Sequence, residues 1–237
     1  ERDYNRTLGK LVTYNAPLLK YIFNPEVDVL TALTYMELCL WNDAKKTVDE
    51  FYDEYSSQAK VVSKMLRKQG KDYKYYYLLS KARREGKVRG SELLNRILGA
   101  ITRDPAFQEL YEAFKSGRNE LEIVRTVRPK RFRRILSTNL KESLLLQRNL
   151  IGAYVRKNVH LYNYQVNSAF ENMSYIKLEV LNRRKRQLYQ PSSKGSRRRG
   201  DIKYLKRNEK QYFWNFNGEF WADELGDYVF SLKSECK

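Results

Sequence analysis

Residues 24–58, NPEVDVLTALTYMELCLWNDAKKTVDEFYDEYSSQ, carry two amphipathic helix patterns in close succession. In the first pattern the apolar residues fall on one face of a helix (Val29, Ala32, Leu33, Met36 and Leu40). After a short break at residues 41–43, the second pattern does the same (Ala44, Val48, Phe51, Tyr52 and Tyr55). Because the connection is so short, two helices of about 15 residues each are predicted to pack as an antiparallel hairpin.

The rest of the chain is rich in helix signals and poor in residues that break helices. It contains only 11 Gly and 5 Pro, which argues against an all-β protein and for long helices. A break is expected near Gly70, and Ser91 has the character of a helix N-cap. Asp104 followed by Pro105 predicts a further helix start, because a capping carboxylate precedes a proline at the first helical position.

Residues 129–190 predict one long helix. Apart from Gly152, no breaking residue lies between Pro129 and Pro191, so a rod of about 60 residues and on the order of 90 Å is expected. Within it, apolar residues alternate by three and four, which is the seam of a coiled coil (Val159, Tyr162, Val166, Ala169, Met173, Ile176 and Val180). Such a seam needs a partner helix, either residues 105–126 of the same chain or another copy of the protein.

The composition changes after residue 190. QPSSKGSRRRG, residues 190–200, has the Pro, Ser, Gly and like charges of a linker. Beyond it, aromatic residues crowd a short tail, and Asn217-Gly218 between aromatic runs indicates a small β-hairpin. Because burial of an aromatic ring is favourable, we expect this tail to dock on the helical body. The predicted order is a helical hairpin region (1–60), a helical connector (61–128), the long coiled-coil helix (129–190), a basic linker (191–202) and the aromatic tail (203–237).

The hairpin at residues 24–58 resembles a tetratricopeptide repeat, whose unit is two helices in roughly 34 residues. The likeness rests on small residues where the helices cross, on aromatic residues in the first helix and at the turn, and on packing positions of the second helix (Ala32, Tyr35, Trp41, Ala44, Val48 and Phe51). Ser56 and Ser57 stand where that family has a closing proline. Since one repeat cannot bury its faces alone, residues 8–23 are expected to supply half of another repeat, or the array continues upstream of Glu1.

More narrowly, the chain resembles tetratricopeptide proteins of the bacterial cell envelope, including those of gliding and outer-membrane machinery. The residues that carry this likeness are Pro25, Glu26, Leu38, Cys39, Leu40, Trp41, Ala44, Phe51 and Tyr55, with FNGEFWADELGDY (216–228) and a near-terminal cysteine at the other end. The resemblance implies a scaffold in the periplasm or cell envelope. Four aromatic residues are then expected to anchor a partner protein (Tyr35, Trp41, Tyr52 and Tyr55). A precursor signal is not seen in this chain, which begins at Glu1 without Met.

The net charge of +18 predicts association with polyanions or an anionic membrane surface. Basic residues gather in runs, and those expected to contact a polyanion are Arg125, Arg128, Lys130, Arg131, Arg133, Arg134, Arg197, Arg198 and Arg199. The alternative is that these runs are solvated faces and a linker. No recognised nucleic-acid module accompanies the charge, so nucleic acid is the less favoured partner.

The two cysteines, Cys39 and Cys236, leave two alternatives open. They form one disulfide, which requires an oxidising compartment, or they are free thiols with Cys39 packed inside the first helix of the hairpin. They are too few for a zinc site of four thiolates, and His160 is the only histidine, so no metal and no cofactor are predicted. The acidic residues of the tail (Glu219, Asp223, Glu224 and Asp227) are expected to dock against basic residues of the body.

No nucleophile motif, phosphate loop or dinucleotide fingerprint is present, and we therefore predict that the protein is not an enzyme. The expected function is a protein–protein interaction scaffold or adaptor of a bacterial envelope assembly, binding through the tetratricopeptide face and the long helix, with self-association through that helix as one outcome. The alternative is a basic coiled-coil protein of the cytoplasm that binds nucleic acid or another polyanion. A signal peptide upstream of Glu1 would favour the first function and exclude the second.

Overall fold

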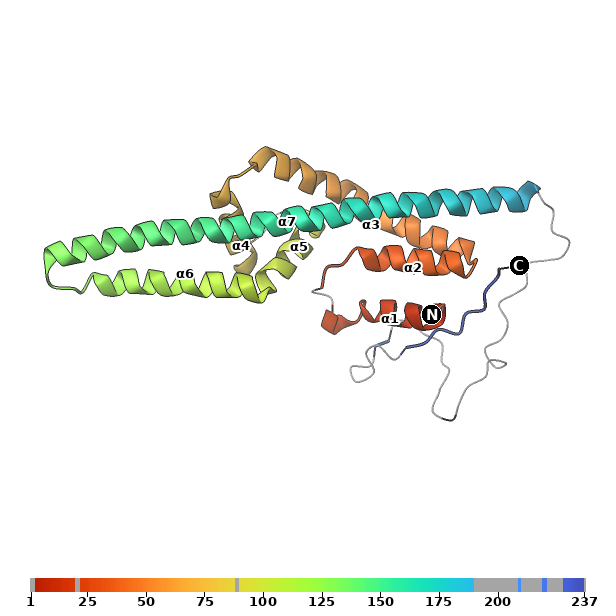
Figure 1. Ribbon diagram of the computed structural model, residues 1–237, viewed down its shortest axis with the longest axis horizontal. Helices are drawn as coiled ribbons and strands as arrows, with labels where there is room; N and C mark the ends of the chain where they lie inside the picture. The colour runs from red at the N-terminus through yellow and green to blue at the C-terminus, as the bar shows by residue number, and fades with distance from the viewer. Residues whose placement is uncertain are drawn as a thin grey trace. The chain divides into compact units, whose positions relative to one another are not determined.

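The structure is a computed structural model that describes residues 3–19, 22–87, 90–189, 209, 219–220 and 228–236. Of these residues 81% are helical and none forms a strand, so the predicted all-α fold class is confirmed (Figure 1). The helices are α1 (Tyr4–Thr13), the 3-10 turn η1 (Pro17–Leu19), α2 (Glu26–Glu37), α3 (Trp41–Gln69), α4 (Tyr73–Arg84), α5 (Glu92–Arg103), α6 (Pro105–Val124) and α7 (Lys130–Tyr189). The linker predicted at 191–202 and the β-hairpin predicted around Asn217 lie outside the described residues.

Side chains cap the helices where the sequence predicts helix starts. The Ser91 hydroxyl accepts a hydrogen bond from the backbone N–H of Leu94 at 3.3 Å, at the start of α5. The Asp104 carboxylate accepts one from Ala106 at 2.8 Å, with Pro105 as the first residue of α6. Each cap satisfies a backbone donor that has no partner within the helix and typically contributes about 1 kcal/mol.

The boundaries of the predicted hairpin differ from the expected ones. α2 ends at Glu37, and α3 then continues for 29 residues to Gln69, about twice the predicted length. Ser56 and Ser57 do not end α3, because its buried face continues past them with the period of a helix (Tyr55, Ala59, Val62 and Leu66). Packing of that face therefore outweighs the weak helix preference of two serines.

Cys39 lies in the turn after α2, so the prediction that it sits inside a helix was wrong. The N–H of Leu40 donates to the carbonyl of Tyr35 and the N–H of Cys39 to that of Met36, both at 2.9 Å. These two bonds are those of a Schellman motif, in which the residue after the C-cap adopts the left-handed conformation. Cys39 has φ +56° and occupies that position, which usually holds glycine.

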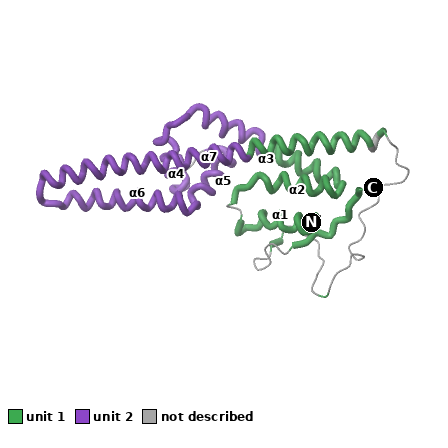
Figure 2. Tube along the Cα trace, viewed as in Figure 1, with its two compact units in different colours: residues 1–54, 166–237 green, residues 55–165 purple. Residues whose placement is uncertain are grey.

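The chain divides into two compact units (Figure 2). Unit 1 comprises Glu1–Glu54 and Val166–Lys237, and unit 2 comprises Tyr55–Gln165. α3 and α7 each contribute residues to both units. This division does not follow the linear order predicted from the sequence, since both ends of the chain belong to the same unit.

In unit 1, α1 packs on α2, and the beginning of α3 lies along the end of α7. The polar contacts between α3 and α7 include Tyr52 Oη to Ser174 Oγ (2.7 Å), Asp49 to Lys177 (3.8 Å) and Asn42 to Arg184 (2.9 Å). Each step back along α3 is matched by an equal step forward along α7. This register shows that the two helices are antiparallel.

In unit 2, α4 packs on α5 and α5 on α6, and α7 runs beside them. Gly152 does not interrupt α7, but it allows a close approach: a Cβ at this position would lie 1.9 Å from the carbonyl oxygen of Tyr73 at the start of α4. Farther along α7, burial raises the pKa of Tyr154 to about 12, and a hydrogen bond with the Asp104 carboxylate adds to that rise. The close approach of Gly152 to the backbone of Tyr73 and the hydrogen bond of Tyr154 with Asp104 therefore hold the middle of α7 in this unit.

Candidate interaction sites

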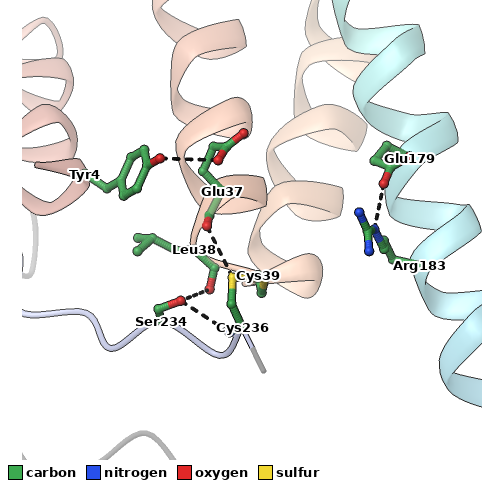
Figure 3. The surroundings of a disulfide bond; sticks show 8 residues. All are labelled: Tyr4, Glu37, Leu38, Cys39, Glu179, Arg183, Ser234 and Cys236. Carbon is green, nitrogen blue, oxygen red and sulfur yellow. Dashed lines mark hydrogen bonds and ion pairs between the residues drawn. A yellow bond between two sulfur atoms is a disulfide. The ribbon is translucent and has the colours of Figure 1, made fainter. Parts of the chain in front are cut away.

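Cys39 and Cys236 form a disulfide, so of the two alternatives for the cysteines the structure contains the bonded one (Figure 3). Their Cα atoms lie 5.1 Å apart, and the bond joins residues separated by 197 positions. Next to it, the N–H of Glu235 donates to the carbonyl of Leu38 at 2.9 Å. The Cys236 sulfur lies 3.4 Å from the carbonyl oxygen of Glu37, a contact without a proton because a disulfide sulfur has none to donate.

The segment 228–236, which we call the C-terminal strap, lies along α1 and the end of α2. Asn5 holds it with both side-chain atoms: Nδ2 donates to the carbonyl of Leu232 at 3.1 Å, and Oδ1 accepts from the N–H of Leu232 at 3.0 Å. The backbone carbonyl of Asn5 also accepts from Phe230 at 3.1 Å. Phe230 and Leu232 pack against the core cluster of Leu8, Leu38 and Leu40. The strap is therefore attached by hydrogen bonds and apolar contacts as well as by the disulfide.

Gly9 on α1 makes room for the strap. A Cβ added to Gly9 would lie 1.5 Å from the carbonyl oxygen of Tyr228, a distance that only a shift of backbone would relieve. The sequence pattern did not single out Asn5 or Gly9, because nothing local distinguishes an asparagine or a glycine that contacts residues more than 200 positions away. The signals that this end of the chain returns to the helices were the aromatic residues of the tail and the near-terminal Cys236.

The four aromatic residues predicted as partner anchors are used largely within the chain. Tyr55 is only 3% exposed, so the prediction was wrong for that residue. Tyr35 packs against the α1–α2 core cluster, and the Tyr52 ring lies 5.3 Å from that of Phe170 on α7. Trp41 is half-buried, with the Arg183 guanidinium 5.9 Å from its ring centroid. Tyr35, Trp41 and Tyr52 are partly exposed, and their role as partner anchors stays a prediction.

The predicted seam of α7 is buried within the chain. Six of its seven residues are less than one-tenth exposed, and Tyr162 is half-buried (the six are Val159, Val166, Ala169, Met173, Ile176 and Val180). In unit 1 the neighbouring contacts of this face are made with α3, since Phe170 packs against Phe51 and Tyr52. In unit 1 the helix beside the seam is therefore α3. The two partners that were expected, residues 105–126 and another copy of the protein, do not take that place.

The opposite side of α7 is apolar and exposed. Its exposed large side chains fall in pairs that recur every 14 or 15 residues along the helix (Phe132 and Ile135, Leu146 and Leu150, Leu161 and Tyr164, Tyr175 and Leu178, and then Tyr189). Four turns of helix separate successive pairs, so the helical period places them on a common side, roughly opposite the buried seam. We call this set the exposed face of α7. The spacing of these exposed residues is present in the sequence, but the more regular spacing of the seam was the pattern used for the prediction.

The predicted polyanion-binding residues between 125 and 134 converge at one end of the α6–α7 hairpin. Arg125, Lys130, Arg133 and Arg134 line a pocket of about 380 Å³ together with Ser137. The Arg133 guanidinium also donates to the carbonyl of Arg125 at 3.5 Å, across the turn between the helices. Arg128 and Arg131 are exposed beside them. The other three predicted residues, Arg197, Arg198 and Arg199, lie outside the described residues.

In comparisons with known proteins, no family profile matches the chain, and no curated protein or solved structure shows significant similarity to it. None of the helices in the described ranges is long and apolar enough to cross a membrane. Among the same residues, no three His, Cys, Asp or Glu side chains gather where they could hold a metal ion.

Proposed function

We propose that the protein is a non-enzymatic scaffold of a bacterial cell-envelope assembly, related to tetratricopeptide proteins, which binds a partner helix along the part of the exposed face of α7 that belongs to unit 1 (Tyr175, Leu178 and Tyr189). The observation that carries the proposal is the exposure of paired apolar residues on that face. Tyr175 and Leu178 are 72% and 59% exposed, although they belong to a helix whose other side is buried. Apolar side chains repeated at helical spacing are what a second helix packs against.

The disulfide supports the envelope location. Disulfides persist in oxidising compartments such as the periplasm and are rare in the reducing cytosol. The cytoplasmic alternative, a basic protein that binds nucleic acid, requires Cys39 and Cys236 to be reduced in the cell. Their redox state therefore separates the two functions.

The location is tested by alkylating thiols in intact cells before lysis. We expect mass spectrometry to find one peptide pair joined through Cys39 and Cys236 and no alkylated cysteine. Two alkylated thiols would remove the support for the envelope and favour the cytoplasmic alternative.

The binding face is tested by cross-linking in native cells with two matched variants. Tyr175→Lys combined with Leu178→Lys places two charges on the exposed face, while Asn167→Lys combined with Asn172→Lys places two charges on exposed positions beside it. We expect the first variant to lose the cross-linked partner and the second to retain it, with the same helical content in both. Retention of the same partner by both variants would exclude this face as the binding site.

A second copy of the chain is one candidate for the partner. Sedimentation of the purified protein decides this, because a dimer that only Tyr175→Lys with Leu178→Lys converts to a monomer identifies the partner as another copy. A monomer at every concentration excludes another copy as the partner, and the cross-linking experiment then tests whether a different protein binds the face.

A further inference from the structure

The end of the α6–α7 hairpin concentrates positive charge. From Ile123 to Leu140 the sequence has six Lys or Arg and no Asp or Glu. We call residues 123–135, which include the end of α6, the turn and the start of α7, the hairpin end; all belong to unit 2. Among the described residues, the ion pairs of these six cations are limited to Arg125 with Glu122. Several cations therefore converge without carboxylates to neutralise them, as in a site that awaits an anionic partner.

Apolar side chains protrude between these cations. Ile123, Phe132 and Ile135 are 65%, 54% and 58% exposed. Phe132 and Ile135 are one helical turn apart on α7, and Arg131 and Arg134 are their chain neighbours. An exposed phenylalanine flanked by isoleucines and arginines combines the two kinds of contact that an interfacial membrane segment makes.

The combination of positive charge and exposed apolar side chains at the hairpin end favours a lipid surface over a nucleic acid. Phosphates of either partner satisfy the arginines, and a base stacks on an aromatic ring such as Phe132. Ile123 and Ile135 have no comparable contact on a nucleic acid, whereas acyl chains just beneath anionic head groups accept them. The pocket of Arg125, Lys130, Arg133 and Arg134 then takes the head-group phosphate while the apolar side chains enter the boundary below it.

We infer that the hairpin end docks on an anionic phospholipid surface. The contact is peripheral: charge draws the hairpin end to the head groups, and Ile123, Phe132 and Ile135 enter the interface. Phe132 and Ile135 belong to unit 2, whereas Tyr175 and Leu178, on which the proposed function is tested, belong to unit 1. Failure of either proposal therefore leaves the other standing.

The test is co-sedimentation of the full, oxidised chain with phosphatidylcholine vesicles that contain or lack phosphatidylglycerol. We expect binding only to the anionic vesicles. Lys130→Gln, Arg131→Gln and Arg134→Gln together should weaken it about 100-fold, since each surface cation typically changes lipid affinity about fivefold. The matched control removes three exposed cations from α3 of the same unit, through Lys60→Gln, Lys64→Gln and Arg67→Gln, and should bind nearly as the unaltered protein does.

A second variant separates lipid from nucleic acid. Phe132→Ser with Ile135→Ser keeps every charge, and we expect it to lose vesicle binding while its weak binding of a duplex oligonucleotide is unchanged. Arg131→Lys with Arg134→Lys checks folding and charge together, because it preserves both and should bind vesicles normally. The proposal is overturned if the charge variant and its α3 control bind anionic vesicles equally, if Phe132→Ser with Ile135→Ser binds them normally, or if the oligonucleotide binds more tightly than the vesicles.

Discussion

Loss of the Cys39–Cys236 disulfide should destabilise unit 1 by an amount that the structure allows us to estimate. The bond spans a sequence separation of 197 residues, so nearly the whole chain is closed into one loop. In the chain-entropy description, a loop of that size contributes about 5 kcal/mol, and measured contributions are more often about 2 to 4 kcal/mol. We therefore expect Cys39→Ala with Cys236→Ser to lower the free energy of unfolding by about 2 to 5 kcal/mol.

The left-handed backbone of Cys39 adds a smaller effect that a second variant isolates. An alanine at φ +56° pays a steric penalty that glycine avoids, and the net difference should be about 1 kcal/mol. Cys39→Gly with Cys236→Ser lacks the same disulfide as the alanine variant and differs from it only at this position. It should therefore be the more stable of the two by about 1 kcal/mol.

Urea unfolding followed by tryptophan fluorescence measures both effects, because Trp41 lies in unit 1 close to the turn. The unaltered protein in a reducing agent should unfold at nearly the same urea concentration as the alanine variant, which lacks the bond without the reagent. If reduction leaves the unfolding free energy unchanged, the disulfide does not restrain the unfolded chain as reasoned. If the glycine and alanine variants are equally stable, position 39 does not keep the left-handed conformation once the bond is removed.

Three further predictions concern α7. Gly152→Ala should destabilise unit 2 by about 2 to 4 kcal/mol, seen as a lower melting temperature, because its Cβ would overlap the carbonyl of Tyr73; an unchanged melting temperature would show that the two backbones are not in contact. Tyr154 should titrate near pH 12, and Asp104→Asn should lower that pKa while burial still holds it above the usual 10. Because the pKa of Tyr154 is raised in the folded state, the protonated hydroxyl contributes its full stabilisation below about pH 10, and this contribution is lost as the pH rises toward 12. Alkaline unfolding of the unaltered protein and of Asp104→Asn will check this. Val166→Asp should cost roughly 3 to 5 kcal/mol and reduce helical content, because it leaves a charge buried without a partner; loss of self-association with no loss of stability would instead mean that the seam faces another copy.

Periodicity and helix signals were sufficient for the all-α fold class, for the long helix and for the starts of α5 and α6, but not for the bounds of α2 and α3. The long helix was predictable because no proline lies between Pro129 and Pro191, and the α5 and α6 starts because Ser91 and Asp104 are local capping residues. Each of these features acts within a few residues of itself. For that reason each of them can be recognised in the sequence without knowledge of the rest of the fold.

The pairing of helices was not predictable in the same way. The seam of α7 indicated that some helix covers it, but an apolar stripe accepts many partners, and nothing in the pattern specified α3 rather than residues 105–126. The prediction that Tyr55 anchors a partner protein was wrong for a related reason. Tyr55 has the character of an interface anchor in sequence, yet a tyrosine anchors two helices of one chain by the same contacts it would make with a partner.

The basic residues of the hairpin end were predictable as a group, because they are adjacent in sequence. What the sequence did not show was their convergence on one pocket, which depends on the turn that brings Arg125 near Arg133. The protruding isoleucines were equally unmarked. An exposed isoleucine and a buried one look alike until the neighbouring helix is placed.

The division of the chain into units has a consequence for its biosynthesis. Unit 2 is inserted into unit 1, so residues 1–54 leave the ribosome long before residue 166 appears. At the usual rate of synthesis the delay between residue 54 and residue 230 is roughly 9 to 35 seconds, during which the core cluster of α1 and α2 lacks Phe230 and Leu232. Unit 2, being continuous in sequence, has all of its residues before unit 1 does. The first helices to be made are therefore among the last to be completed.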